Sequence, residues 1–473
     1  TTGLDLAAST ISGTLTATGG ASAGIVDSGN VAVAGNVTLT TDAGNGVINM
    51  GTLQQSAGDL ILVTNGNGAA TVVNNAAIDF GTSNVGGALD VTASAGTITQ
   101  NGGALTVAGT SAFTTSTNDQ AITLSNTTNA LTGAVAFTTG GTTGNVVIDN
   151  GTTGLDLAAS TISGTLTATG GASAGIVDSG NVAVAGNVTL TTDAGNGVIN
   201  MGTLQQSAGD LILVTNGTGA ATVVNNAGID FGTSNVGGAL SATASAGNIT
   251  QNGGAITVAG TSSFILGANS ANVVLDHASN AFSGAVTLLA GAGGSQAFGN
   301  VTFVDDSAVK IDANADAAGD LYLNAGTDGA VGGNLAVTAT TGNITQGVAV
   351  AVTGTSAFTT SASDATITLG TTTNALGGTV AFTTAGTAGN VVIDNGTTGL
   401  DLAASTINGT LTATGGATAG IVDSGNVAVA GNVTLTTDAG NGVINMGTLQ
   451  QSAGDLILVT NGNGAATVVN NAA

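Results

Sequence analysis

The sequence predicts an all-β chain folded as a parallel β-helix, a solenoid in which each coil stacks on the next. Residues 1–66 recur without a change at 152–217, and residues 1–77 recur at 397–473 with two differences, Ser12→Asn408 and Ser22→Thr418. Copies of this fidelity indicate an array whose units contact their neighbours. Within the copies, apolar β-branched residues alternate with small or polar ones, which is the pattern of strands with one buried face.

Shorter units build the long repeat. Apolar clusters such as GIVDSG, GVINMG and ATVVNN recur at short, similar spacings, and six such spacings span one long repeat. The clusters begin at Gly24, Gly46, Ala70, Gly96, Gln120, Asn145 and Gly175. Each unit contains three strand-like pieces separated by turn formers, so we expect about 19 coils of roughly 24 residues. Parallel crossovers are almost always right-handed, and we expect the same hand here.

The repeats indicate one continuous solenoid over residues 1–473 in place of several globular domains. Its long repeats are 1–151, 152–396 and a partial copy, 397–473. The second copy is longer than the first, by about four coils near 265–342. Both ends of the chain fall inside a repeat, where a solenoid presents an unpaired strand edge. We therefore expect a piece of a longer array, and self-association end to end or laterally.

The composition fits this fold and excludes several functions. Glycine occurs 79 times and proline never, which suits tight turns between strands that donate every ladder N–H. We expect a core of Val, Ile, Leu and Ala, with Phe at places such as Phe80, Phe113 and Phe137. The net charge is −25, from 26 acidic residues and one basic residue, Lys310. Nucleic-acid binding needs many basic residues and is excluded, and adsorption to anionic membranes is disfavoured for the same reason.

The chain has no cysteine, so it has neither disulfides nor thiolate metal sites. No run of residues reaches the length of an apolar membrane-spanning helix, so we expect no membrane insertion. Charged residues make up only 6% of the chain, so most of the surface must be Thr, Ser, Asn and Gly, and such a hydroxyl- and amide-rich surface suits a protein outside the cell or on its surface.

The extra coils near 265–342 contain the residues that occur only once, His277, Lys310 and Tyr322. They also contain the candidate metal site, where oxygen ligands stand at alternate positions as in the first half of a calcium loop. The predicted ligands are Asp312, Asn314, Asp316 and Asp320. The pattern then departs from the calcium loop, with Ala317 in place of glycine and Leu323 in place of the final glutamate. The alternative is a solvated polar turn with no cation.

Two further functions can be weighed against the residues. Asp305 and Asp306 offer a carboxylate pair of the kind that glycosidases use, but a chain with one lysine and one histidine lacks the basic groups that hold an anionic sugar. We therefore expect no enzyme, no catalytic residues and no cofactor apart from calcium. Threonines at alternate positions, as in TLTAT from Thr14 and TLTT from Thr38, suggest an ice-binding surface, although threonine also suits exposed strand positions in general.

The segment from Gly13 to Gly46, GTLTATGGASAGIVDSGNVAVAGNVTLTTDAGNG, resembles the repeats of large secreted exoproteins of Gram-negative bacteria, the filamentous-haemagglutinin-like adhesins. The resemblance covers essentially the whole chain and rests on composition and period. It implies a right-handed β-helix shaft, export across the outer membrane, and a role in adhesion, biofilm or surface fibres. We therefore predict a structural extracellular fibre or adhesin shaft, with a host or surface glycan as a partner. The alternative is a module that binds calcium, glycan or ice through the coils 265–342 or the threonine ladders.

Overall fold

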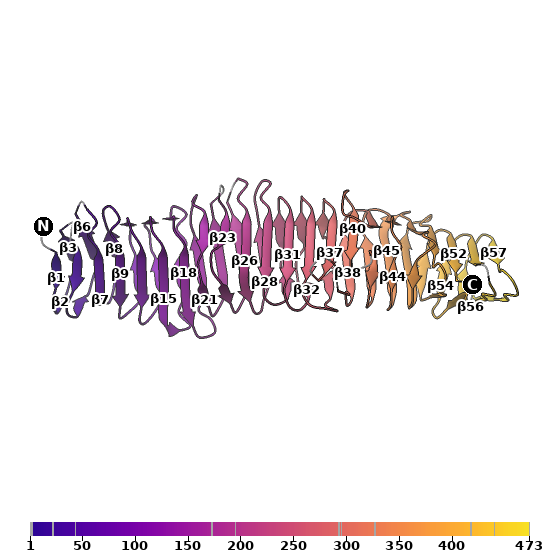
Figure 1. The fold of residues 1–473 in the computed structure, drawn as a ribbon, viewed down its shortest axis with the longest axis horizontal. Coiled ribbons are helices and arrows are strands. Elements are labelled where there is room, and N and C mark those ends of the chain that lie inside the picture. Colours follow the sequence, from indigo (N-terminus) through magenta and orange to yellow (C-terminus); the bar gives the residue numbers. More distant parts are fainter. Residues whose placement is uncertain are drawn as a thin grey trace. The chain divides into compact units, whose positions relative to one another are not determined.

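The chain is an all-β parallel solenoid of about 21 turns, with ~22 residues per turn and no helix among the residues that the structure describes. The computed structural model describes residues 3–20, 23–42, 44–171, 174–193, 195–291, 294, 296–325, 328–416, 419–438 and 440–472. They form two compact units, residues 1–227 with 235–238, and residues 228–234 with 239–473. In each unit the strands of successive coils run side by side (Figure 1). The predicted fold class is confirmed.

The strands are short and recur with the sequence. Strands β20–β33 in the second copy repeat β1–β14, and β50–β58 in the third copy repeat β1–β9. The first nineteen are β1 (Leu4–Leu6), β2 (Ser9–Ile11), β3 (Leu15–Gly19), β4 (Ile25–Asp27), β5 (Val31–Val33), β6 (Val37–Thr41), β7 (Ile48–Gln55), β8 (Leu60–Val63), β9 (Ala70–Asn74), β10 (Ile78–Phe80), β11 (Ser83–Val85), β12 (Leu89–Ala93), β13 (Ile98–Gln100), β14 (Leu105–Val107), β15 (Ser111–Asn118), β16 (Ile122–Leu124), β17 (Ala130–Leu131), β18 (Val135–Gly140) and β19 (Val146–Asp149).

The strands between the two series of copies belong to the longer second repeat. They are β34 (Ser262–Leu266), β35 (Val273–Leu275), β36 (Ala281–Phe282), β37 (Val286–Ala290), β38 (Val301–Asp305), β39 (Val309–Asp312), β40 (Asp320–Asn324), β41 (Ala330–Val331), β42 (Leu335–Ala339), β43 (Ile344–Gln346), β44 (Ala351–Val352), β45 (Ser356–Ser363), β46 (Ile367–Leu369), β47 (Ala375–Leu376), β48 (Thr379–Ala385) and β49 (Val391–Asp394).

Each coil pairs in parallel with the coils before and after it, and identical positions stack. Strand β3 pairs with β6 so that Ala17 faces Leu39, and β6 pairs with β8 so that Leu39 faces Leu62. Side chains alternate between the interior and the surface along each strand, and Leu39 and Leu62 are fully buried. The core is therefore a set of apolar columns, joined by stacked rings such as Phe113 and Phe137, whose centroids lie 5.8 Å apart.

The two faces of the coil exchange roles along the first copy. In the early coils, one face of the solenoid (the first face) consists of two short strands, such as β4 and β5, and the opposite face (the second face) consists of one longer strand, such as β6. The long strand β7 pairs with both β4 and β5, and then with the single strand β9 through a register shift between Met50 and Leu53. From β9 onward the second face is the split one, with β10 and β11. A coil of two unsplit strands, β18 and β19, precedes the return to the original arrangement.

This exchange explains why the number of turns exceeds the predicted number. The first long repeat, 1–151, holds seven coils, although its apolar clusters numbered six. The clusters at Gly24, Gly46 and Ala70 form β4, β7 and β9 on the first face. Those at Gly96, Gln120 and Asn145 form β13, β16 and β19 on the second face. The clusters therefore mark the first face at the start of the first long repeat and the second face at its end, and counting them gives one coil too few.

The described residues contain no helix that is long and apolar enough to cross a membrane.

Candidate functional site

Strands β39 and β40 carry the predicted metal ligands, and they lie where chain order and spatial order differ. Strand β40 pairs with β37, β39 pairs with β40, and β43 pairs with β39. The later strand β40 therefore lies between β37 and the earlier strand β39. The loop 313–319 joins these two parallel strands, so Lys310 and Asp312 of β39 face Asp320 and Tyr322 of β40.

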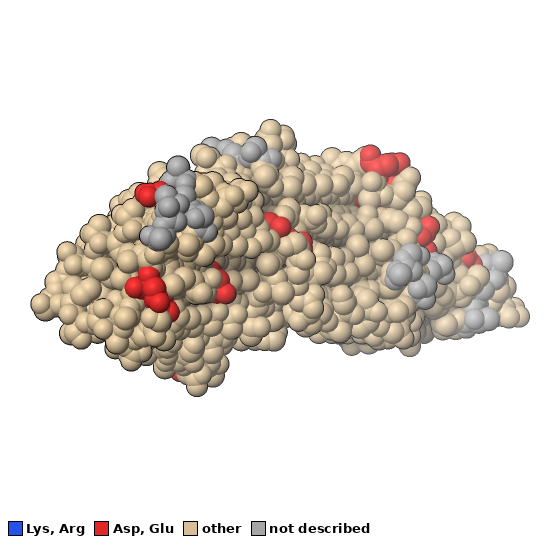
Figure 2. All heavy atoms as spheres, turned by 60° about the vertical axis from the view of Figure 1, so that its left-hand side comes forward, with Lys and Arg blue, Asp and Glu red and all other residues tan. Residues whose placement is uncertain are grey.

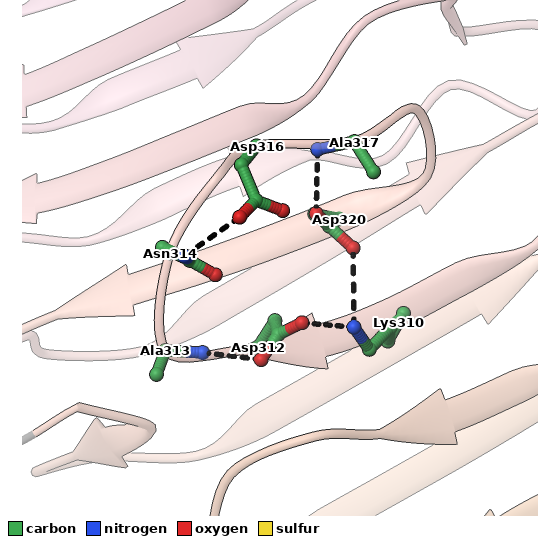
Figure 3. Close-up of polar contacts among 7 residues, drawn as sticks. All are labelled: Lys310, Asp312, Ala313, Asn314, Asp316, Ala317 and Asp320. Atoms are coloured by element: carbon green, nitrogen blue, oxygen red, sulfur yellow. Dashed lines mark hydrogen bonds and ion pairs between the residues drawn. The ribbon is translucent and has the colours of Figure 1, made fainter.

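Lys310 holds this pair of strands together. Its ammonium bonds the Oδ2 carboxylate oxygen of Asp312, and its Nζ lies 3.8 Å from Oδ1 of Asp320 (Figure 3). The Asp320 side chain is 2% exposed, whereas the Lys310 side chain is 45% exposed. The ammonium lowers the pKa of the Asp312 carboxyl below its usual value, and Asp312 in turn raises the pKa of Lys310. The one lysine of the chain thus lies on the strand pair whose order in space differs from its order along the chain.

The four predicted ligands lie on the loop 313–319 and on the strand ends beside it, and they bond neighbouring groups of the protein. Asp312 Oδ1 accepts the Ala313 N–H at 2.8 Å, and Asp320 Oδ2 accepts the Ala317 N–H at 2.8 Å. Asn314 Nδ2 donates to Asp316 Oδ2 at 2.8 Å, as Figure 3 shows. Among the residues that the structure describes, no three His or acidic side chains come close enough to hold a metal ion. Calcium binding here stays a prediction.

Asp305 and Asp306, the carboxylate pair considered for hydrolysis, do not face the same space. Asp305 is 2% exposed, and Asp306 is exposed. Asp305 Oδ1 accepts the backbone N–H groups of Phe282 and Asp306, each at 2.9 Å, and Oδ2 accepts the Ser307 hydroxyl at 2.6 Å. Burial raises the pKa of the Asp305 carboxyl above its usual value. The two carboxylates cannot flank one glycosidic bond in this arrangement.

Asp305 occupies a position that other coils fill with asparagine. Asn150 Oδ1 accepts the Leu131 N–H at 2.8 Å, and its Nδ2 donates to the Leu131 carbonyl at 3.0 Å. Asn395 bonds Leu376 in the same way, at 2.8 and 3.1 Å. These buried side chains satisfy backbone groups at corners that strand pairing leaves open. In the sequence these asparagines look like turn residues, because their burial follows only from the fold.

His277 and Tyr322, the other residues that occur once, make local bonds. The ring Nδ1 of His277 accepts the backbone N–H of Ser279 at 3.1 Å, and the backbone N–H of His277 donates to Gln251 Oε1 at 3.3 Å. The Tyr322 hydroxyl donates to Asp328 Oδ1 at 3.0 Å. Burial and this bond raise the pKa of Tyr322. Neither side chain joins the Lys310 cluster through a hydrogen bond to a described residue.

The threonine pairs considered for ice binding extend over two coils. Thr16 and Thr18 of β3 stack on Thr38 and Thr40 of β6. The next coil places Ile61 and Val63 at these positions. A flat surface of paired threonines therefore ends there, and the ice-binding alternative receives no support from the register.

A surface groove recurs at equivalent places in the two units. In the first unit it has a volume of about 580 Å³ and is lined by small outward residues such as Ala183, Ala185 and Ser207. Its counterpart in the second unit measures about 290 Å³. Asn408 lines the smaller groove where Ser163 lines the larger one. On the face shown in Figure 2, acidic side chains form separate small groups and no basic side chain is visible.

Comparisons with known proteins identify the repeats. No curated protein and no solved structure matches the chain. A family model described as repeats of unknown function (DUF5649) matches four consecutive segments, residues 66–138, 143–217, 218–289 and 298–383, which together make up more than half of the chain. The chain therefore belongs to the DUF5649 family of repeats of unknown function.

Proposed function

We propose that this chain is the shaft of an extracellular fibre or adhesin, a structural element built from stacked solenoid coils. One observation supports the proposal most directly: what recurs in the long copies is a set of hydrogen bonds that stack the coils, and not a cluster of reactive side chains. Asp27 accepts the Gly51 and Thr52 N–H groups at 2.8 Å, and Asp178 and Asp423 make the same bonds in the later copies. Repeated corner bonds of this kind serve the stacking of coils.

The chemistry of the described residues favours a passive role. The acidic side chains are spread over many coils, the carboxylates nearest to Lys310 bond the protein itself, and Asp305 is buried. We infer that the chain is no enzyme. A core of apolar columns with paired backbone groups resists local opening, which suits a protein exposed to proteases outside the cell.

The resemblance to filamentous-haemagglutinin-like exoproteins adds a biological setting to the proposal. A shaft of that kind is displayed on the cell surface or secreted, associates with copies of itself, and supports attachment to a host or surface glycan or the cohesion of a biofilm.

Electron microscopy of the native material, with and without a calcium chelator, tests the proposal. We expect filaments or rods with an axial repeat near 4.8 Å, the spacing of neighbouring strands. Dissolution by the chelator would assign a structural role to calcium and would support the predicted site at Asp312–Asp320. Compact particles without this repeat would contradict a shaft.

A further inference from the structure

The larger of the two recurring surface grooves lies across three neighbouring strands of the first unit. These strands are β21 (Ser160–Ile162), β24 (Val182–Val184) and β26 (Ile199–Gln206). Their register places the outward residues Thr161, Ala183 and Gln205 side by side, one in each coil. Because alanine is smaller than threonine or glutamine, Ala183 and its neighbour Ala185 form a low floor between the longer side chains of the coils on either side.

Four polar side chains at this groove have hydrogen-bonding groups that the chain does not use. They are Thr161, Gln205, Ser207 and Asn226, and no hydrogen bond joins any of these side chains to another described residue. Hydroxyl and amide groups can both donate and accept hydrogen bonds. Among the described residues that line the groove, none is charged. The groove is therefore complementary to an uncharged ligand that offers donors and acceptors of its own.

The wall of the groove at Gly141 is held in place by the protein itself. Asp119 Oδ1 accepts the Thr142 N–H at 2.7 Å, and Ser163 Oγ donates to the Gly140 carbonyl at 2.8 Å. A site that is formed in advance loses less conformational freedom when a ligand binds. Its volume of about 580 Å³ also lies within the range of roughly 300–1,000 Å³ that is usual for small-molecule sites.

Ligands of other classes fit this groove less well. Strands β21, β24 and β26 are each paired on both sides, so the groove offers no free strand edge to an extended peptide. A net charge of −25 repels nucleic acids and acidic glycans. A metal ion finds no carboxylate among the described residues of the lining.

We propose that this groove binds a neutral oligosaccharide. The inference rests on the proposed function, a shaft that attaches to a glycan, and it adds the site and the chemical class of the ligand. Sugar hydroxyls donate and accept hydrogen bonds as the unused groups of Thr161, Gln205, Ser207 and Asn226 do. The same column of outward residues recurs as Thr10, Ala32, Gln54 in the first long copy and as Thr406, Ala428, Gln450 in the third. A polysaccharide with repeated units would therefore meet more than one such column on a chain.

The test probes a glycan microarray, which displays neutral, sialylated and uronate-containing oligosaccharides, with the fluorescently labelled full chain at a series of concentrations. We expect binding to neutral oligosaccharides and none to the acidic ones. A first variant fills the floor of the groove in all three long copies. This variant is Ala32→Gln/Ala183→Gln/Ala428→Gln, which introduces the residue that stands one coil later in the same column. We expect it to bind neutral oligosaccharides at least about tenfold more weakly.

The matched control makes the same change at outward alanines away from the groove. It is Ala112→Gln/Ala136→Gln/Ala357→Gln, and its apparent affinity should stay within about twofold of the wild type. A second variant removes hydrogen-bonding groups without filling the floor. It is Gln54→Leu/Gln205→Leu/Gln450→Leu, and it should weaken binding several-fold because it leaves sugar hydroxyls without partners.

Four results would overturn the proposal: no binding to any neutral oligosaccharide, binding to acidic ones alone, unchanged binding by the filled variant, or equal losses for the filled variant and its control. Self-association that the filled variant loses in sedimentation velocity, with no glycan bound by the wild type, would assign the groove to a second copy of the chain and refute the sugar site. Electron microscopy of the same samples reports the axial repeat independently, so the shaft can stand when the sugar site fails.

Discussion

Replacing Asp305 with asparagine should stabilise the protein. Asp305 stands where Asn150 and Asn395 stand in other coils, and all three accept the N–H of a residue one coil earlier: Phe282, Leu131 and Leu376. Asparagine keeps this acceptor and carries no charge. It also brings an Nδ2 donor, and in Asn150 that donor reaches the Leu131 carbonyl at 3.0 Å. The variant therefore gives this coil the buried asparagine that other coils have at the same position.

The magnitude follows from the bonds around the carboxylate. Two of its three donors, the N–H groups of Phe282 and Asp306, bond Oδ1 and are retained in Asp305→Asn. The third, the Ser307 hydroxyl, bonds Oδ2 and can rotate to accept from the new amide. A new bond from Nδ2 to the Phe282 carbonyl contributes about 0.5–1.5 kcal/mol. We expect a gain of at least this size near pH 7, because the variant also removes a carboxyl whose pKa is raised by burial.

The sign of the pH dependence is fixed by the raised pKa of Asp305. Between the ordinary pKa and the raised one, the folded state holds a proton that the unfolded state has lost, so wild-type stability falls as the pH rises through that window. The asparagine of the variant has no such proton to lose. The part of the advantage that comes from the raised pKa should therefore be full at neutral pH and be lost below the ordinary pKa of aspartate, whereas the part from the new Nδ2 bond should not depend on pH.

Hydrogen exchange of the Phe282 amide, followed from about pH 4 to pH 8, measures the local free energy of opening without assuming that the whole solenoid unfolds in one step. Asp306→Asn is the matched control, because it removes a neighbouring charge from an exposed position. Weaker protection of Phe282 in Asp305→Asn would refute the assignment of Asp305 to the asparagine position, and a gain that does not depend on pH at all would refute the raised pKa of Asp305.

Three further variants test the core, the turns and the inverted strand pair. Phe137→Ala removes a fully buried ring that stacks on Phe113, and should cost about 3–5 kcal/mol in denaturant unfolding of the first unit. Gly24→Ala should lower the midpoint of thermal unfolding, because Gly24 has a φ of +67° and an added Cβ would lie 1.9 Å from the Val47 carbonyl oxygen. The positive φ alone costs an alanine about 1–2 kcal/mol. The control Gly13→Ala should be neutral, because a Cβ at Gly13 meets nothing within 4 Å. Lys310→Met should reduce the protection of β40 amides and raise calcium affinity measured by calorimetry, since it frees the Asp312 and Asp320 carboxylates; unchanged calcium binding would show that the ammonium does not compete.

The sequence was sufficient to predict the solenoid because its period and alternation are local properties. The strand at Val37–Thr41, the columns of Val, Ile and Leu, and the coil turns all follow from the printed pattern. It could not give the number of coils, since an apolar cluster looks the same on either face and the exchange at β7 depends on pairing with both earlier and later coils. The candidate ligands Asp312 and Asp320 were expected to lie close together, and they stand at the strand ends on either side of the loop 313–319. The ion pair between Lys310 and Asp320 depends on the inverted order of β39 and β40, and no spacing in the sequence encodes that order.

The copies themselves separate what stacking requires from what a coil can vary. Asp27, Asp178 and Asp423 are bonded identically in all three copies, so an acid at that corner is a structural part of the coil. Asp156 and Asp401 also recur, yet each leaves one buried oxygen without a donor among the described residues, which stacking does not require.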